Sequence, residues 1–345
     1  MMINKEKLIK GMSLEDLSCL CQDLGHANYR GEQVFHWLYK HRKDGFNETS
    51  NLPLDLVNKL KGYEVQTLKL EKESISDSKN TIKLLFKTID SMYIETVSML
   101  EGDRHTVCIS SQIGCSVDCK FCATGKMGIK RNLHAGEIID QIIYVLDNIN
   151  HEITNIVYMG MGEPFLNYKN VIKSADIFSH PKAFNFSKKR ITISTAGILP
   201  SLKKFINDKH KYKLAISLNA SNNQSRRQLM PINNKWPIED LINIAIDYNK
   251  LYKSKITFEY VLIKNRNDSE KNAIELRKIL SNIECKINII PYNDINSEFE
   301  RPSDEIINNF IKVLIKKHTR YQVLVRWSKG QDIEAGCGQL ATLSE

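Results

Sequence analysis

The chain has 345 residues and carries 49 lysine and arginine residues against 40 aspartate and glutamate residues, a formal net charge of +9. Its 42% hydrophobic and 26% charged residues exclude an intrinsically disordered protein. No apolar run reaches the ~18 residues that a membrane span needs, and the first residues lack the apolar core of a signal peptide. We therefore expect a cytoplasmic protein with no membrane association, and the charge suggests an anionic partner such as nucleic acid.

The first part of the chain, residues 1–62, is predicted to be a helical accessory domain. A helical pattern spans 31–42, and after a break at Pro53 a second helix covers 54–60. This part mixes aromatic and basic side chains, as RNA-binding surfaces do, although its aromatic residues are equally suited to a core. Residues 63–100 are predicted to form a short β-rich connector. Its strands are expected at 81–86 and 93–97.

The remainder, residues 101–345, alternates short β-rich runs with helical periodicity. Six successive units of this kind predict an α/β fold in which a parallel sheet is wrapped as a partial barrel and covered by helices. Reactive groups in such folds lie at the carboxyl ends of the strands. Strands are expected at 105–110, 155–159, 190–194, 213–218, 255–263, 286–290 and 321–327, and helices at 136–149, 238–252 and 303–317.

Eight cysteines in a reducing compartment are not a disulfide framework. Cys115, Cys119 and Cys122 follow the first barrel strand with CxxxCxxC spacing, so their thiolates can converge on one metal centre. A structural zinc site uses four protein ligands, whereas three cysteines on a four-iron cluster leave one iron open. The alternative is a zinc site, whose fourth ligand would be Cys108, His105 or His134.

Small polar residues follow several of the predicted strands. Glycine lets the backbone approach a ligand, and a carboxylate accepts hydrogen bonds from an ammonium group. Each motif alone is a common turn, but together they place candidate ligand-binding groups on the same edge as the three cysteines. The motifs are MGMGEP (159–164), STAG (194–197), SLN (217–219) and PYN (291–293).

Cys337 lies between two glycines near the chain end, which predicts an accessible and pliable loop. Reactive thiols need access, whereas structural cysteines are usually buried. The alternative is a cysteine without a role in a C-terminal tail. Cys108 lies on the first barrel strand, seven residues before Cys115, and can also reach the centre of this edge.

Ordered motifs along nearly the whole chain resemble one family. The CxxxCxxC motif with Phe121 before its last cysteine resembles the radical S-adenosylmethionine enzymes. Further motifs are similar to the RlmN/Cfr family of rRNA adenine methyltransferases. They are YRGEQVFHWLY (29–39), CISSQIGC (108–115), ATGK (123–126), RNL (131–133), GMGEP (160–164), LMPIN (229–233) and CGQL (337–340).

The resemblance implies a radical S-adenosylmethionine partial (β/α)6 barrel with a helical N-terminal domain, a short β extension and a C-terminal catalytic loop. It implies one [4Fe-4S] cluster on Cys115, Cys119 and Cys122, and two S-adenosylmethionine molecules per turnover. Within the strand-end motifs, the residues that match cofactor-binding positions of the family are Gly162, Glu163, Ser194, Ser217, Leu218, Asn219 and Asn293. The family also implies an external electron donor such as a flavodoxin, and we expect a monomer.

The resemblance also implies a mechanism. Cys337 is methylated by a first S-adenosylmethionine, and a radical from the second removes a hydrogen atom from that methyl group. The carbon radical adds to adenine. Cys108 then attacks the sulfur of Cys337, and the transient disulfide releases the product. Glu95 matches the family position that removes the ring proton.

The substrate implied by the resemblance is C2 of an adenine in the peptidyl-transferase region of 23S rRNA, and of the tRNA adenine 3′ to the anticodon. Pro164 and the N-terminal region favour C2 over the C8 position used by the Cfr-type resistance enzymes. Asn219 and Gly336 depart from the His and Ala that the family generally has. An alternative of another class is a non-catalytic zinc-stabilised RNA-binding protein.

Basic residues predict where RNA is bound. Segment 182–213 holds nine lysines and arginines against one acid, Asp208. A phosphate backbone requires such a footprint, although solvated helix faces have the same composition. Further basic candidates are Lys126, Lys130, Arg131, Arg226 and Arg227.

Overall fold

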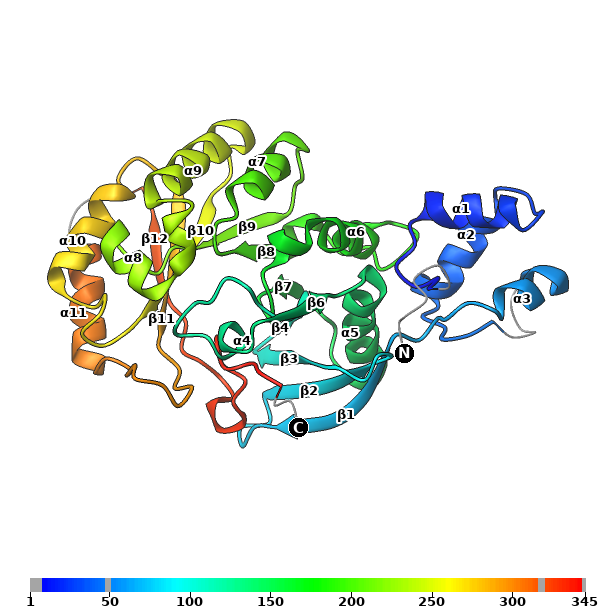
Figure 1. Ribbon diagram of the computed structural model, residues 1–345, viewed down its shortest axis with the longest axis horizontal. Helices are drawn as coiled ribbons and strands as arrows, with labels where there is room; N and C mark the ends of the chain where they lie inside the picture. The colour runs from blue at the N-terminus through cyan, green and yellow to red at the C-terminus, as the bar shows by residue number, and fades with distance from the viewer. Residues whose placement is uncertain (1–7, 47–50, 316–319, 343–345) are drawn as a thin grey trace.

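The computed structural model describes residues 8–46, 51–315 and 320–342. Its main feature is a ten-stranded sheet that curves around the core, with helices on its outer side (Figure 1). In spatial order the strands are β1 (Leu68–Ile75), β2 (Thr81–Thr88), β3 (Tyr93–Glu101), β4 (Arg104–Cys108), β7 (Asn155–Tyr158), β8 (Ile191–Thr195), β9 (Lys213–Ser217), β10 (Ile256–Leu262), β11 (Cys285–Pro291) and β12 (Gln322–Val325).

The sheet has two parts that meet at β4. Strands β1 to β4 pair antiparallel, and β2 and β3 correspond to the strands expected in the connector at 63–100, whereas β4 corresponds to the strand expected at 105–110. From β4 onward every neighbouring pair is parallel, through β7 to β12. The predicted α/β fold with a parallel, partial barrel is therefore confirmed. Cys108, the last residue of β4, lies opposite Val97 of β3 and Val157 of β7.

The helices between the parallel strands are amphipathic and bury their apolar faces against the sheet. Ile138, Ile142 and Val145 of α5 are buried, as the periodicity predicts. The third predicted helix, 303–317, ends at Leu314, and its last two predicted residues lie outside the described part. The helices are α5 (Ala135–Asn148), α6 (Tyr168–Ser179), α7 (Leu199–Asn207), α8 (Asn223–Leu229), α9 (Ile238–Tyr252), α10 (Glu270–Ile279) and α11 (Asp304–Leu314).

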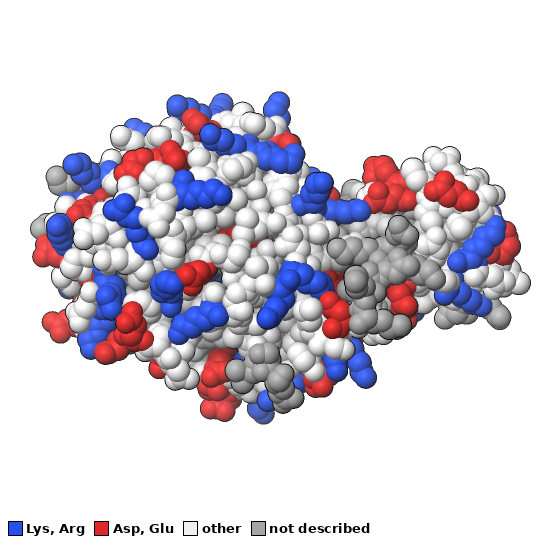
Figure 2. All heavy atoms as spheres, in the orientation of Figure 1, with Lys and Arg blue, Asp and Glu red and all other residues white. Residues whose placement is uncertain are grey.

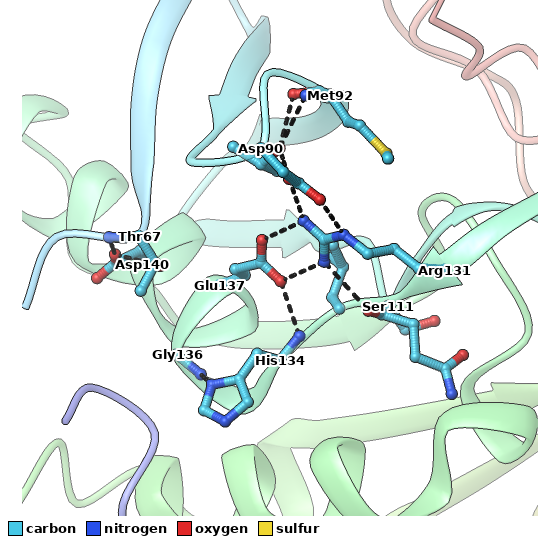
Figure 3. A network of polar contacts seen from close by, with 12 residues as sticks. Thr67, Asp90, Met92, Ser111, Arg131, His134, Gly136, Glu137 and Asp140 are labelled. Carbon is cyan, nitrogen blue, oxygen red and sulfur yellow. Dashed lines mark hydrogen bonds and ion pairs between the residues drawn. The ribbon is translucent and has the colours of Figure 1, made fainter. Parts of the chain in front are cut away.

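The N-terminal helices lie beside the barrel, at the right of Figure 1. The predicted helix over 31–42 begins one residue earlier and changes to a π-helix in its second half. Lys10 contacts Asp140 of α5 at 3.1 Å, and Thr67 donates to the same carboxylate, so α5 anchors this part (Figure 3). The N-terminal elements are α1 (Leu14–Asp23), α2 (Arg30–Phe35), the π-helix η2 (His36–Lys40) and α3 (Leu54–Leu60).

Two further features surround the cysteine motif. A hairpin of β5 (Gln112–Gly114) and β6 (Ile129–Asn132) encloses the motif and a short helix, α4 (Ala123–Lys126), and the periodicity did not predict it because its strands are very short. The C-terminal segment returns to the β extension, where the amide of Asp77 donates to Asp332 at 2.7 Å. No helix within the described residues is both long and apolar enough to cross a membrane.

Candidate active site at the carboxyl ends of the strands

The loop that carries the three predicted cluster cysteines is held by the β5–β6 hairpin. The amide of Cys115 donates to the carbonyl of Gly128 at 3.0 Å. Gly114, just before it, has φ +73°, and a Cβ there would lie 1.7 Å from the Gly128 oxygen. Only glycine permits this approach. The hairpin therefore fixes where Cys115 enters the loop.

The three thiols share one apolar pocket. Cys115 is buried and Cys119 and Cys122 are partly buried, in a cluster of apolar side chains that includes Val117 and Phe121. Burial raises the pKa of Cys115 to about 12, with Glu163 and Cys122 adding to the shift. Burial, together with Cys122 and Cys115, also raises the pKa of Cys119. The three sulfurs are therefore close enough to act on one another.

This donor set fits an iron–sulfur cluster. A structural zinc site uses four protein ligands, whereas this pocket holds three cysteines. Three neighbouring thiols in an apolar shell suit a larger centre, whose iron ions are ligated by cysteine and whose remaining iron stays open.

Gly162 and Glu163 follow β7 and contact the β5–β6 hairpin, which encloses the cysteine motif. Gly162 has φ +96°, and a Cβ there would lie 2.4 Å from the side chain of Gln112. The Glu163 carboxylate accepts from the amides of Phe165 at 2.9 Å and Ala196 at 2.6 Å. Burial raises the pKa of Glu163 to about 7, and these hydrogen bonds oppose the shift. A buried carboxylate bonded to neutral donors fits the ammonium group of S-adenosylmethionine.

The next two strand ends place Ser194, Ser217 and Leu218 on the same edge. Arg226 of α8 ties these ends together, because its guanidinium donates to the carbonyls of Ala196, Ser217 and Leu218. The prediction of Arg226 as a phosphate contact is wrong, because its side chain is completely buried. The neighbouring Arg227 is exposed.

The surroundings of Asn219 suit an asparagine at this position, where the family generally has His. It adopts φ +55°, a left-handed conformation that Asn tolerates better than most residues. Its side-chain oxygen accepts from the amide of Val261 at 2.8 Å, and its nitrogen contacts the sulfur of Met230 at 3.3 Å. Asn219 thus joins the end of β9 to β10, and its amide side chain is bound within the protein.

Asn293, after β11, contacts the C-terminal loop. Its Nδ2 donates to the carbonyl of Cys337 at 3.0 Å, and its Oδ1 accepts from Gln331 at 2.9 Å. Gly336 makes this approach possible, because a Cβ at Gly336 would lie 2.8 Å from Nδ2 of Asn293. The departure at Gly336 therefore permits close packing of the loop against Asn293.

The C-terminal loop also lies on the cysteine motif. The amide of Ala123 donates to the carbonyl of Gly338 at 2.7 Å, and Thr124 donates to the carbonyl of Leu340. Cys337 keeps access to solvent. Desolvation by the surrounding segments raises the pKa of its thiol, Arg326 opposes the shift, and Glu259 and Cys122 add to it. Cys337 is therefore brought into the electrostatic range of the cluster loop.

Cys108 and Cys337 come from distant parts of the chain, and both are free thiols. Burial raises the pKa of Cys108 to about 12, the charge of Cys337 adds to this shift, and Arg326 opposes it. Arg326 directly follows β12. Its Nη1 lies 3.9 Å from the buried carboxylate of Glu259 on β10. One arginine thus faces both sulfurs and one carboxylate.

Glu95 of β3 is buried and belongs to the same region. Its Oε1 lies 3.1 Å from Nζ of Lys83 on β2, and its Oε2 accepts from the amide of Ala341 at 3.0 Å. Burial raises the pKa of Glu95, and Lys83 opposes the shift. Lys83 also reaches the carbonyl of Glu334 at 3.5 Å. The Lys83–Glu95 pair therefore contacts the C-terminal loop on both sides of Cys337.

Several residues of the site were not predicted from the sequence. Arg326 was detectable, because it is the first residue after a parallel strand, where reactive groups gather. Lys83 and Gln112 had no such signal: Lys83 is one of many lysines, and Gln112 is an ordinary polar residue before the motif. Their contacts arise from pairing of β2 with β3 and of β5 with β6.

The predicted basic contacts are only partly available. Arg131 makes paired hydrogen bonds to Asp90 and Glu137, at 2.6–2.8 Å (Figure 3), so its interpretation as a phosphate contact is wrong. Most lysines and arginines of segment 182–213 lie before β8 or β9, at the amino ends of these strands and away from the reactive edge. In Figure 2, lysines and arginines are dispersed over the barrel with acidic side chains between them.

The accessory domain supplies one exposed aromatic group with a cation. The ring of Tyr29 is 60% exposed, and the guanidinium of Arg30 lies 4.7 Å from its centroid. Tyr39 is instead part of the core, and its hydroxyl donates to the carbonyl of Met12. The aromatic residues of this part are therefore divided between core and surface.

Comparison with known proteins agrees with this geometry. Residues 109–277 match the model of the radical SAM superfamily, and residues 8–65 match that of the ribosomal RNA large subunit methyltransferase N-terminal domain. A crystal structure of a radical SAM methyltransferase from Sphaerobacter thermophilus superposes with a TM-score of 0.91. It is 40% identical and covers 96% of this chain and 98% of its own.

Two curated relatives are similar over almost the full length. The "Probable dual-specificity RNA methyltransferase RlmN" of Pseudothermotoga lettingae is 40% identical over 96% of both chains. The "Dual-specificity RNA methyltransferase RlmN" of Bdellovibrio bacteriovorus is 39% identical and covers 97% of this chain and 84% of its own.

The barrel, the three-cysteine loop and these matches define a radical S-adenosylmethionine enzyme. Within that class, the chain belongs to the RlmN family of dual-specificity RNA methyltransferases. Enzymes of this family use a [4Fe-4S] cluster and S-adenosylmethionine. The zinc-stabilised, non-catalytic alternative is thereby set aside.

Proposed function

We propose that this protein methylates C2 of an adenine in the peptidyl-transferase region of 23S rRNA, and of the tRNA adenine 3′ to the anticodon. The relatives named above are dual-specificity RNA methyltransferases. The observation that carries the proposal is the placement of two free cysteines from distant segments on the edge that holds the three-cysteine loop: Cys108 ends β4, and the backbone of Cys337 is held by Asn293 after β11. A direct methyl transfer to a nucleophilic nitrogen or oxygen of RNA needs no cysteine.

In this proposal Cys115, Cys119 and Cys122 hold the cluster. Gly162, Glu163, Ser194, Ser217, Leu218, Asn219 and Asn293 form the S-adenosylmethionine site. When bound, the cluster and S-adenosylmethionine supply the radical chemistry that activates a methyl group. Glu163 is suited to the ammonium group, since its carboxylate is buried and bonded to neutral amides.

Cys337 accepts and then donates the carbon. Its access to solvent lets a methyl donor and then a base approach it. Cys108, buried next to it, attacks the sulfur of Cys337 once the carbon is bound to adenine, so that the S–C bond breaks and an S–S bond forms. The unpaired electron of the adduct would first pass back to the bound cluster. The electron pair of the broken S–C bond then stays on the carbon, which takes up a proton and becomes the methyl group of the base. Thiols of the reducing cytoplasm restore both cysteines.

Glu95 acts as the base that removes the proton from the ring carbon. It is buried on β3 against the C-terminal loop, and its carboxylate contacts Lys83 and the amide of Ala341. The adenine must leave its stack to reach this region. We assign RNA binding also to the accessory domain, residues 1–62, which 63–100 connects to the core at 101–345. An external donor such as a flavodoxin reduces the cluster, and the protein acts as a monomer.

The first prediction tests the role of Cys108. Cys108→Ala is expected to retain methylation of Cys337 and to stop before release, so that protein stays covalently joined to RNA through Cys337. Denaturing gels and mass spectrometry of the cross-link measure this. Cys19→Ala, an exposed cysteine of α1, is the control and should turn over normally.

Full turnover by Cys108→Ala would contradict release through a disulfide. Mass spectrometry of the wild-type product gives the second readout, because C2 and C8 methyladenine are distinguishable. A product methylated at C8 would overturn the proposed position and favour the Cfr-type activity.

A further inference from the structure

Arg226 has an unusual environment for an arginine. Its side chain is completely buried and is the largest such side chain in the described part of the chain. Nε donates to the carbonyl of Leu218 at 3.0 Å, and Nη2 donates to those of Ala196 at 2.7 Å and Ser217 at 3.2 Å. Nη1 contacts Asn233 and the carbonyl of Trp236. Every partner is a neutral oxygen.

No carboxylate in the described ranges forms an ion pair with Arg226. The carboxylate of Glu163 accepts from the amide of Ala196, and the carbonyl of the same residue accepts from Arg226. It is therefore linked to Arg226 only through the backbone. Hydrogen bonds to neutral groups offset part of the cost of burying a cation, but the charge itself remains uncompensated.

Arg226 lies next to the cysteine loop. The residue that follows Cys119, Lys120, donates its amide at 2.9 Å to the carbonyl of Leu229, three residues after Arg226. Leu229 and Ala196 belong to the same apolar cluster as the three cysteines. The uncompensated cation is therefore buried beside the segment that carries the three cysteines.

We propose that Arg226 is a positioning residue that supplies a fixed positive charge to the iron–sulfur cluster and raises its reduction potential. The inference rests on the proposed cluster site at Cys115, Cys119 and Cys122. A cluster held by three thiolates gains a further negative charge on reduction, and nearby charge is one of the factors that set its potential. In an apolar pocket the interaction is screened weakly.

Arg226 also fixes the backbone of two residues of the proposed S-adenosylmethionine site, because it donates hydrogen bonds to the carbonyls of Ser217 and Leu218. Its two roles are separable. The hydrogen bonds act on the geometry of β8 and β9, whereas the charge acts on the redox equilibrium of the cluster. A variant that keeps the charge and changes the geometry therefore distinguishes them.

The experiment is an EPR-monitored redox titration of the anaerobically reconstituted full chain, with dithionite as reductant. Arg226→Met and Arg226→Gln remove the charge, and Arg226→Lys keeps it. Arg227→Met is the matched control, since Arg227 is the adjacent residue but is exposed. Iron content and circular dichroism report cluster loading and folding.

We expect the neutral variants to lower the ratio of reduced to oxidised cluster at a fixed potential about tenfold, a shift of about 59 mV for one electron. Arg226→Lys and Arg227→Met should stay within about a factor of two of the wild type. If the cluster loads in Arg226→Lys but in neither neutral variant, this result also supports a requirement for the positive charge of Arg226.

An unchanged potential in either loaded neutral variant would overturn the proposal. So would failure of Arg226→Lys to load the cluster together with the neutral variants, because geometry alone would then explain Arg226. A wild-type protein that binds no cluster would instead refute the proposed cluster site, so the two failures are distinguishable.

Discussion

The thiols of Cys108 and Cys337 lie in different surroundings. Cys108 is buried at the end of a central strand, and burial raises its pKa to about 12. Cys337 lies on a loop that solvent reaches. Arg326 favours the thiolate form of both, which suits a pair in which each sulfur acts once as nucleophile. The difference in access matches the proposed order, in which Cys337 reacts first.

Glu95 gives the prediction at the residue scale. A base must be ionised, so activity is lost as the pH falls through the pKa of Glu95, which burial raises and Lys83 lowers. Lys83→Met removes the lowering charge. In Lys83→Met the acidic limb of the plot of kcat/KM against pH should therefore move to higher pH. In Lys83→Arg, which keeps the charge, the limb should return to its wild-type position.

The matched control is Lys87→Met, which removes the same charge four residues along β2. Profiles are measured by incorporation of labelled methyl groups into substrate RNA. A Lys83→Met limb that coincides with that of the wild type would contradict the assignment of Glu95 as the base.

At the scale of elements, the site depends on segments that hold one another in place. Arg131 of β6 binds Asp90, in the turn between β2 and β3, and Glu137 of α5 (Figure 3). Each carboxylate receives two hydrogen bonds, the fork geometry that only arginine provides. The cysteine hairpin is thereby fastened to the β extension and to α5.

Loss of this fork is expected to destabilise the protein. Arg131→Met leaves two largely buried carboxylates without a cation, which costs about 3–5 kcal/mol in comparable sites. Arg131→Lys should recover only part of the loss, because an ammonium group cannot bind both carboxylates in pairs. Urea unfolding measures the change, with the exposed Lys130→Met as control. If the free energy of unfolding falls by less than about 1 kcal/mol, the ion pairs of Arg131 contribute no more than exposed surface pairs do.

At the scale of the whole molecule, the two ends of the barrel differ. Reactive groups occupy the carboxyl ends of the strands, whereas Lys189 lies two residues before β8 and Lys211 two residues before β9, at the amino ends. Lys126 and Lys130 follow the cysteine motif in the chain and are exposed. RNA that delivers a base to Cys337 is therefore expected to contact Lys126 and Lys130 rather than Lys189 and Lys211.

This difference predicts the salt dependence of RNA binding. The double variant Lys126→Gln/Lys130→Gln should lower the slope of log K against log salt by about 0.7 for each phosphate that the protein no longer neutralises. Lys189→Gln/Lys211→Gln changes the net charge equally and should leave the slope unaltered. Fluorescence anisotropy with a substrate RNA fragment measures both. The reverse result would place the RNA at the amino ends.

Much of the fold was predictable because its signals are local. The seven parallel strands appear within a few residues of their predicted positions, since buried strands are apolar runs separated by amphipathic helices. The β5–β6 hairpin was missed, because its strands are three and four residues long and are stabilised by Gly114 and Gly128 at a distance in the chain.

The sequence by itself determined the chemistry: the spacing of Cys115, Cys119 and Cys122, the strand-end motifs and the loop cysteine Cys337 are all local patterns. Only the tertiary structure decided which charges act on them. Arg131 and Arg226 read as surface cations, yet one is held by two carboxylates and the other is buried at the cysteine loop. Charge is visible in a sequence, but its partner depends on contacts between residues far apart in the chain, and these form only when the sheet closes around its core.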